Sequence, residues 1–162
     1  MTFSHRPIEN DDIRVICSFP ITERELFFFF PKACWPLSSE QFTATINERV
    51  DNTVVVENGQ VVAFANFYRW GINECAIGNV IVSPLARGKG VGRYLIQTMM
   101  EKAFAQHLTA QVTLSCFNEN VAGLLLYSQM GFEPCAIERR SDHDGNPVAL
   151  IHLCILPPCV CF

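Results

Sequence analysis

The sequence contains no apolar run of the roughly 18 residues that a membrane-spanning helix needs. Its first residues, MTFSHRPIENDD, include acidic side chains and no apolar segment of the kind found in a signal peptide. We therefore expect no membrane partner and a cytoplasmic location.

Positive charge is also scarce. The chain has 12 Lys and Arg against 16 Asp and Glu, which gives a net charge of -4. Nucleic-acid binding needs a basic surface, so we expect no nucleic-acid partner. Charged residues make up only 17% of the chain and hydrophobic residues 49%, a composition that argues against disorder. We expect one domain over residues 1–162 with one substantial core.

Patterns for metal binding and redox chemistry are missing as well. None of the eight cysteines forms a CxxC pair, and His107, His143 and His152 show no metal-ligand spacing. Without a secretion signal we expect structural thiols rather than disulfides. The C-terminal CVCF places Cys159 fourth from the end, a formal match to a prenylation pattern, and we leave a role for Cys159 and Cys161 open.

The first third of the chain reads mainly as helices. A short strand ends near Arg6, and Asn10 or Asp11 is placed to cap a helix. The following ITERELFFFF continues as helix until Pro31 stops it, and a further helix starts at the serine pair 38–39.

The remaining two thirds read as strands with two helices between them. Asn58-Gly59 between two β-branched runs predicts a hairpin, and residues 75–82 predict a third strand. Apolar residues recur every four positions from Val91, which predicts an amphipathic helix to Phe104. A strand at 111–116, a helix at 120–130 and a final antiparallel pair follow, so we expect a mixed sheet with helices on both faces.

The turn Arg87-Gly88-Lys89-Gly90-Val91-Gly92 joins an apolar strand to the amphipathic helix. Glycines allow positive φ and close approach of a ligand, and the first turn of a helix offers free amides and a partial positive charge. These features predict an anion site, with phosphate as the usual occupant. The Walker A and dinucleotide fingerprints both fail on spacing, whereas [RQ]-x-x-G-x-[GA] matches at every position.

That pattern resembles the pyrophosphate loop of the GCN5-related N-acetyltransferases, the GNAT superfamily. The preceding NVIVSP is similar to the strand before the loop in that family, and VTLSCFNENVAGLLLYSQMGFEP is similar to its downstream strand and helix. The resemblance covers nearly the whole chain and is strongest from Gly78 to Pro134. It implies an α/β fold with a mixed, largely antiparallel central sheet of six to seven strands and helices on both faces.

The resemblance also implies acetyl-coenzyme A as cosubstrate and no metal. Amides of the loop would cradle the pyrophosphate beside two basic side chains, and main-chain groups of the preceding strand would pair with the pantetheine arm. Asn120 would hydrogen-bond the pantetheine, and Asn118 would either do the same or cap the helix. The implied coenzyme-binding residues are Val80, Val82, Arg87, Gly88, Lys89, Gly90, Val91, Gly92, Asn118 and Asn120.

For chemistry, the resemblance points to Tyr127 as the acid that protonates the leaving thiolate. A phenol has a reference pKa of about 10 and a thiol about 8.5, so the phenol can donate without being ionised beforehand. The attacking amine must lose a proton. Glu74 and Glu57 are candidates for the base that accepts it, and the alternative is that each is an ordinary surface carboxylate. The amide of Val82 is a candidate oxyanion donor.

The acceptor site is the least determined part. Four consecutive phenylalanines and nearby aromatic residues read first as core, and second as an aromatic wall that could hold a cationic amine. Phe30, Trp35 and Tyr68 are the pocket candidates on the second interpretation, and Glu74 is a further candidate substrate residue.

We therefore expect an N-acetyltransferase that moves acetyl to a small-molecule or peptide primary amine by direct attack in a ternary complex. An acyl-enzyme intermediate on Cys116 is an alternative mechanism, but nothing in the sequence places a base beside that cysteine. A non-catalytic acyl-coenzyme A-binding module is an alternative of another class, which Tyr127 argues against. Acetylation of a protein or of a charged tRNA is a third alternative. Whether the protein forms a homodimer stays open.

Overall fold

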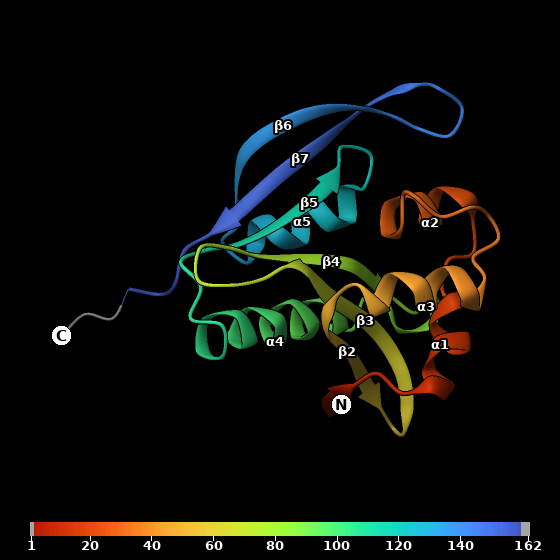
Figure 1. The fold of residues 1–162 in the computed structure, drawn as a ribbon, viewed down its shortest axis with the longest axis horizontal. Coiled ribbons are helices and arrows are strands. Elements are labelled where there is room, and N and C mark those ends of the chain that lie inside the picture. Colours follow the sequence, from red (N-terminus) through yellow and green to blue (C-terminus); the bar gives the residue numbers. More distant parts are fainter. Residues whose placement is uncertain (1, 160–162) are drawn as a thin grey trace.

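The computed structural model describes residues 2–159, so Cys161 lies outside the described residues. The described chain forms one seven-stranded sheet in the order β1-β2-β3-β4-β5-β7-β6 (Figure 1). Only β4 and β5 run parallel, which confirms the expected mixed, largely antiparallel sheet. The strands are β1 Phe3–Pro7, β2 Val50–Glu57, β3 Gln60–Arg69, β4 Cys75–Val82, β5 Val112–Phe117, β6 Glu133–Ser141 and β7 Pro147–Ile155.

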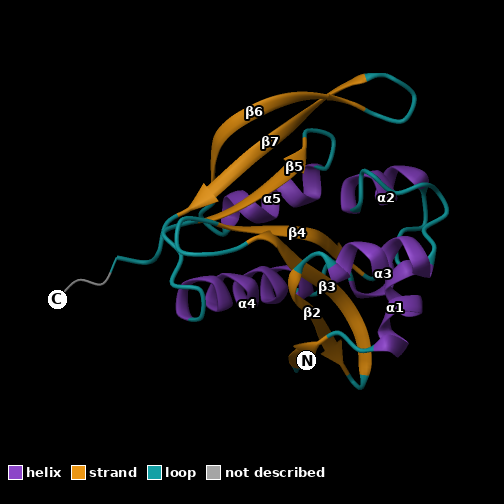
Figure 2. Cartoon of the chain, in the orientation of Figure 1, coloured by secondary structure: helices purple, strands orange, loops and turns teal. Residues whose placement is uncertain are grey.

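Helices cover both faces of this sheet (Figure 2). One face packs against the later helices through a core that includes Phe67, Leu95 and Tyr127. The other packs against the first three helices through a second core that includes Ile16, Phe42 and Phe64. The helices are α1 Asn10–Cys17, α2 Glu23–Phe29, α3 Ser39–Asn47, α4 Val91–Ala105 and α5 Val121–Gln129. None of the helices in residues 2–159 is both long and apolar enough to cross a membrane.

The N-terminal region corrects two expectations. Helix α1 starts after Glu9 rather than at a cap on Asn10 or Asp11, because the Asp12 carboxylate accepts a hydrogen bond from the Glu9 amide at 2.8 Å. The segment expected to continue as helix to Pro31 is instead a separate α2, capped by Thr22, whose hydroxyl accepts from the amide of Glu25.

Turn chemistry explains the register of the remaining elements. Asn58 and Gly59 both have positive φ, 51° and 77°, as a two-residue hairpin turn between β2 and β3 requires. Gly131 has a φ of 99° just after α5, which lets the chain reverse into β6. Both turns follow the sequence prediction.

The feature that positions the site is the short pairing between β4 and β5. Their ladder runs from Cys75↔Val112 to Ile77↔Leu114 and then stops, although β4 continues to Val82 and β5 to Phe117. Beyond Ile77 and Leu114 the two strands diverge, and their main-chain groups in this opening are available to a ligand.

Candidate active site

A cavity of about 570 Å³ lies at this opening, bordered by α2 as well as by the start of α4 and by α5. Its walls come from β4, from the glycine-rich turn, from α5 and from the end of α2. The residues that line it include Val80, Val82, Arg87, Gly88, Gly90, Val91, Gly92, Asn120 and Tyr127. The structure therefore gathers most of the residues implied for coenzyme binding around one cavity.

The glycine-rich turn has the backbone that an anion cradle needs. Gly88 and Gly90 have φ values of 78° and 87°, and Gly90 precedes the first turn of α4. A Cβ at either position would meet nothing within 4 Å, so the positive φ, rather than crowding, requires glycine here. Gly92 differs, because a Cβ there would lie 3.1 Å from Leu126 Cδ2, so the Leu126 side chain of α5 would have to shift slightly.

The positively charged side chain of Arg87, beside this cradle, already has an ion-pair partner. The Arg87 guanidinium donates to the Glu25 carboxylate of α2 at 2.6 Å, and both residues line the cavity. Lys89 belongs to the same turn but is not among the lining residues. No sequence pattern identified Glu25 as a site residue, because its approach to Arg87 depends on how α2 packs across the sheet.

The two asparagines have different surroundings. The Asn120 side chain lines the cavity and caps α5 by accepting from the Gly123 amide at 3.2 Å. Asn118 lies outside that cavity, where its side-chain oxygen accepts from the Ala149 amide at 2.9 Å and ties β5 to β7. The cap of α5 is therefore Asn120 and not Asn118, and Asn118 is not among the residues that line the cavity.

Tyr127 of α5 lines the same cavity and is only 6% exposed. Within residues 2–159 its hydroxyl makes no hydrogen bond, and it packs edge-on against Phe132 with ring centroids 6.1 Å apart. Burial raises the pKa of Tyr127 above its ordinary value, and nearby Cys116 adds to that effect. The hydroxyl therefore keeps its proton at neutral pH and can donate it into the cavity.

A search against family models matches residues 19–132 to the acetyltransferase (GNAT) family. The chain belongs to this family. The ribosomal protein bS18-alanine N-acetyltransferase of Escherichia coli K12 is 28% identical over 119 residues, which span 72% of this chain and 79% of that protein.

Solved structures share the fold over almost the whole chain. Spermidine N-acetyltransferase from Vibrio cholerae, solved with coenzyme A and spermine, has a TM-score of 0.78 at 18% identity and 95% coverage of both chains. The Salmonella typhimurium protein yncA, solved with its cofactor acetyl-coenzyme A, has a TM-score of 0.73 at 19% identity, covering 99% of this chain and 100% of that one.

The chain is thus a GNAT N-acetyltransferase, and acetyl-coenzyme A is its cosubstrate. The cavity fits that molecule: it combines open turn amides, a basic side chain, the unpaired main chain of β4 and a proton donor. No group of three or more His, Cys, Asp or Glu side chains in the described chain is arranged to hold a metal.

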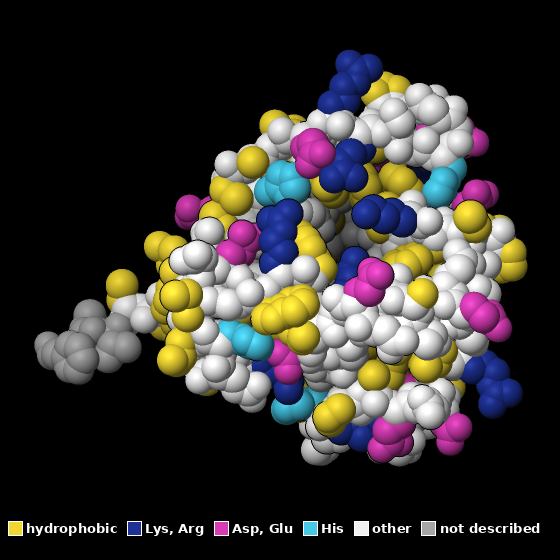
Figure 3. All heavy atoms as spheres, viewed as in Figure 1, with side chains coloured by type: hydrophobic (Ala, Val, Ile, Leu, Met, Phe, Trp, Pro, Cys, Tyr) yellow, Lys and Arg dark blue, Asp and Glu magenta, His cyan; other side chains and the backbone are white. Residues whose placement is uncertain are grey.

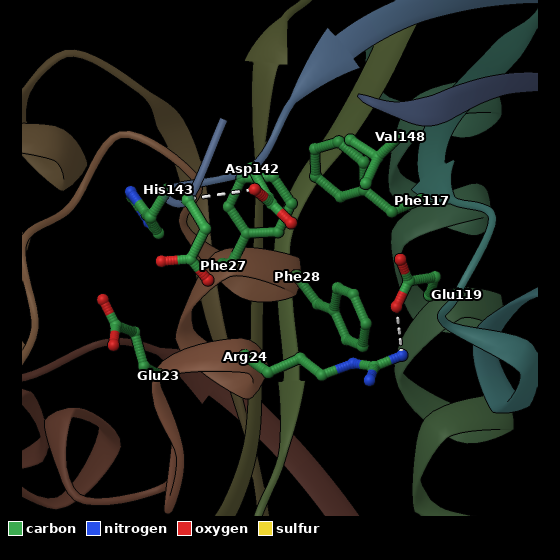
Figure 4. A pocket seen from close by; sticks show the side chains of 10 residues that line it. Glu23, Arg24, Phe27, Phe28, Phe117, Glu119, Asp142, His143 and Val148 are labelled. Carbon is green, nitrogen blue, oxygen red and sulfur yellow. Dashed lines mark hydrogen bonds and ion pairs between the residues drawn. The ribbon is translucent and has the colours of Figure 1, made fainter. Parts of the chain in front are cut away.

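A second cavity of this acetyltransferase, of about 340 Å³, lies beyond α2 (Figure 4). Phe27 of α2 stacks on Phe117 of β5 with centroids 4.4 Å apart, and an ion pair between Arg24 and Glu119 closes one side. Phe28 lines both cavities. Carboxylates of Glu23, Asp142 and Asp144 also border this cavity, which the sequence did not reveal because its walls are far apart along the chain.

The structure does not bring the expected acceptor residues together. Phe30 is buried in the core under α2, and Trp35 is 42% exposed; neither is among the residues that line the two cavities. Tyr68 lies on β3 under two guanidinium groups. Glu74 accepts from Thr113 Oγ1 at 2.5 Å, and Glu57 is at the far end of the β2–β3 hairpin.

Proposed function

We propose that this acetyltransferase moves acetyl to a primary amine by direct attack while both substrates are bound. The observation that carries the proposal is the position of Tyr127, whose unpaired hydroxyl faces the coenzyme cavity beside the β4–β5 opening. The presence of two cavities that Phe28 lines supports the idea of separate places for coenzyme and acceptor.

Coenzyme binding uses main-chain groups for the most part. Amides of residues 88–92 hold the pyrophosphate at the start of α4, with Arg87 and Lys89 adding charge. The main chain of Val80 and Val82 pairs with the pantetheine arm as an additional strand would, and Asn120 bonds the arm from α5. Arg87 exchanges its contact with Glu25 for the phosphate when the coenzyme enters.

Acetyl-coenzyme A supplies an acetyl thioester, and the chain supplies orientation and proton transfer. Tyr127 donates its proton to the departing sulfur, which is possible because burial keeps the phenol neutral. An amide of β4 in the opening, such as that of Val82, donates a hydrogen bond to the carbonyl oxygen.

Cys116 is a poor nucleophile, which supports direct attack over an acyl-enzyme. Desolvation raises the pKa of its thiol to about 12, so almost no thiolate exists at neutral pH. The thiol lies 3.6 Å from the Asn120 carbonyl oxygen, to which it donates a weak hydrogen bond.

The acceptor is a small-molecule or peptide amine. The related enzymes named above act on a ribosomal protein alanine and on spermidine, so both sizes occur among similar proteins. We also propose a cytoplasmic location, because the cysteines of the described chain are all free thiols.

The test separates binding from turnover. Calorimetry should show micromolar binding of coenzyme A and much weaker binding of pantetheine, which lacks the pyrophosphate. A thiol-release assay with acetyl-coenzyme A and a panel of primary amines should then find an acceptor. Equal binding of the two ligands contradicts the assignment of the loop, and binding without turnover of any amine supports the non-catalytic module instead.

A further inference from the structure

One arginine lies where the β4–β5 opening begins, on the face of the sheet opposite Tyr127. Gly78 is the first β4 residue beyond the ladder, and a Cβ built on it would lie 2.8 Å from Arg49 Nη1 and 2.6 Å from Tyr68 Cδ1. Arg49 and Tyr68 therefore cover Gly78 directly. Figure 3 shows one face of the molecule, hollowed near its middle and with Lys or Arg side chains around the hollow.

Neutral amides hold the Arg49 guanidinium in place. Nη1 donates to Asn79 Oδ1 at 2.6 Å and to Asn66 Oδ1 at 3.2 Å, and the guanidinium packs on Tyr68, 5.3 Å from its ring centroid. Asn66 donates to Asn79 and Asn52, so the two amides are themselves fixed. The result is a rigid, preorganised cation rather than a mobile surface side chain.

No carboxylate of residues 2–159 pairs with this guanidinium, although it is half-buried. Arg69 packs on the same Tyr68 ring but has an ion-pair partner, Glu74 at 3.5 Å. Every buried side-chain nitrogen and oxygen in the described chain has a hydrogen-bond partner, so the remaining N–H groups of Arg49 must be reachable from solvent. A partly desolvated cation with free donors is the usual arrangement for binding a carboxylate.

We propose that Arg49 binds a carboxylate of the acceptor, so that the acceptor is an amine of the amino-acid type, with a carboxylate a few bonds from the reacting nitrogen. This inference rests on the proposed acetyl transfer. The short separation follows from the position of Arg49 over Gly78, which directly follows the last residue of β4 that pairs with β5 and lies two residues before Val80 in the wall of the coenzyme cavity.

The test compares each L-amino acid with the primary amine that its decarboxylation would give, by thiol release with acetyl-coenzyme A. The wild-type enzyme should prefer amino acids, and Arg49→Gln should lower their kcat/KM by about ten- to a hundredfold, the usual range for a charged hydrogen bond. The simple amines should change little. Arg69→Gln is the matched control, because it alters the same ring stack without touching the amide-held cation.

Three results would overturn the inference. They are wild-type preference for the simple amines, an equal loss for both classes in Arg49→Gln, or an unchanged amino-acid rate in that variant. If Arg49→Gln does not fold, Arg49→Lys is the second variant. It keeps the positive charge without the planar guanidinium and should still reduce the preference for amino acids over simple amines. If no amine of either class reacts while acetyl-coenzyme A binds, the proposed transfer itself fails.

A second, independent observation concerns the other strand of the opening. Ser115 is the first β5 residue beyond the ladder, and it faces away from Leu114 and Cys116, which pack in the core with Tyr127. Its Oγ lies 2.7 Å from Nδ1 of His152, directly across on β7. Nε2 of His152 lies 3.1 Å from a Glu138 carboxylate oxygen on β6, so three adjacent strands carry one hydrogen-bonded chain.

Glu138 determines the direction of that chain. Arg140 donates to Glu138 at 2.7 Å and, with His152, holds the pKa of that carboxyl below its usual range. An ionised carboxylate only accepts, so Nε2 of His152 carries a proton and Nδ1 accepts from the Ser115 hydroxyl. The other titratable groups beside His152 are Cys135, whose thiol donates to its carbonyl oxygen at 3.4 Å, and Cys154, two positions along β7.

The geometry points to Ser115 and His152 as the route by which the amine loses its proton. As the N–H bond breaks, Ser115 Oγ accepts that proton while its own proton passes to Nδ1 of His152, and Glu138 stabilises the imidazolium. The base then lies on one face of the sheet and the acid Tyr127 on the other. Glu74, the alternative base, is occupied by Thr113 and Arg69.

His152→Gln keeps a polar side chain without a titrating group. With an accepted amine, its kcat/KM should fall by about 10²- to 10⁴-fold and its dependence on pH should change, because the glutamine amide cannot take up a proton. Ser115→Ala should behave in the same way. Hydroxylamine, already neutral at pH 7, should lose much less rate, and His5→Gln is the control with an unrelated histidine.

An unchanged pH profile in His152→Gln would overturn this route, as would equal losses for hydroxylamine and the alkylamine. A burst of coenzyme A release without any amine, if it disappears in Ser115→Ala, would overturn it as well, because it would show Ser115 attacking the thioester as a nucleophile. Coenzyme binding by each variant, measured by calorimetry, separates these results from loss of the coenzyme site.

Discussion

Replacing Tyr127 with phenylalanine removes one hydroxyl from the wall of the coenzyme cavity and leaves the ring in place. Because that hydroxyl has no partner among the described residues, no hydrogen bond within the chain is lost. The free energy of unfolding should therefore change by less than about 1 kcal/mol. The affinity for coenzyme A should also stay the same within a few-fold.

Turnover should respond quite differently. Loss of a general acid lowers kcat by about 10²- to 10⁴-fold at pH 7. The departing thiol has a reference pKa of about 8.5, so above that pH the thiolate leaves without needing a proton. Because burial raises the pKa of Tyr127, the wild type keeps its acid over this range. The ratio of wild-type to variant kcat should consequently shrink as the pH rises past about 9.

The assay is thiol release at saturating acetyl-coenzyme A and acceptor between pH 6.5 and 10, with calorimetry and thermal melting on both proteins. Equal kcat values at pH 7 would refute the acid role. A rate deficit that is the same at every pH would place Tyr127 in positioning rather than proton transfer.

Three further predictions follow from the described contacts. Gly90→Ala, at a φ of 87°, should weaken coenzyme A binding by about five- to thirtyfold by calorimetry, since strain of about 1–2 kcal/mol falls on the loop itself. Glu25→Gln removes the carboxylate that competes for Arg87, a half-exposed pair, and should tighten coenzyme A binding by up to about fivefold, less at high salt. Asp12→Asn should lower the free energy of urea unfolding by about 1–3 kcal/mol at pH 7. The hydrogen bond from Arg6 lowers the pKa of Asp12, so its stabilisation is present above about pH 4 and disappears as the pH falls through the lowered value.

Each of these has a clear contrary result. Gly59→Ala is the matched control for the loop, because it has a φ of 77°, open space around a Cβ and a place in a distant hairpin. If it weakened binding as much as Gly90→Ala, the effect would be general strain. Unchanged affinity in Glu25→Gln would show that Arg87 does not bind the phosphate. A stability difference for Asp12→Asn that persists at pH 2 would exclude the carboxylate as its cause.

Local sequence determined the elements with strong short-range signals. Asn58-Gly59 could only be a tight turn with positive φ, and the regular apolar spacing after Val91 could only bury one face as a helix. The loop from Arg87 to Gly92 was identifiable for the same reason, since its chemistry depends on backbone conformation and consecutive amides.

The N-terminal helices were harder to predict, because competing side chains near Glu9 and Thr22 offer similar caps and tertiary contacts choose between them. The candidate acceptor residues show the same limit. Phe30 and Phe28 are almost equivalent in sequence, yet packing buries Phe30 in a core and places Phe28 in the walls of two cavities.

The sequence by itself thus determined the family, the sheet and helices, and the site for a phosphate-bearing coenzyme, because these depend on spacing over a few residues. Only the tertiary structure decided the contacts on which the proposals about the acceptor rest. Arg49 covers Gly78, and Ser115 bonds to His152, which in turn bonds to Glu138, although these residues are far apart in the chain. The sheet register fixes such pairs, and no local pattern encodes which side chains it will bring within hydrogen-bond distance.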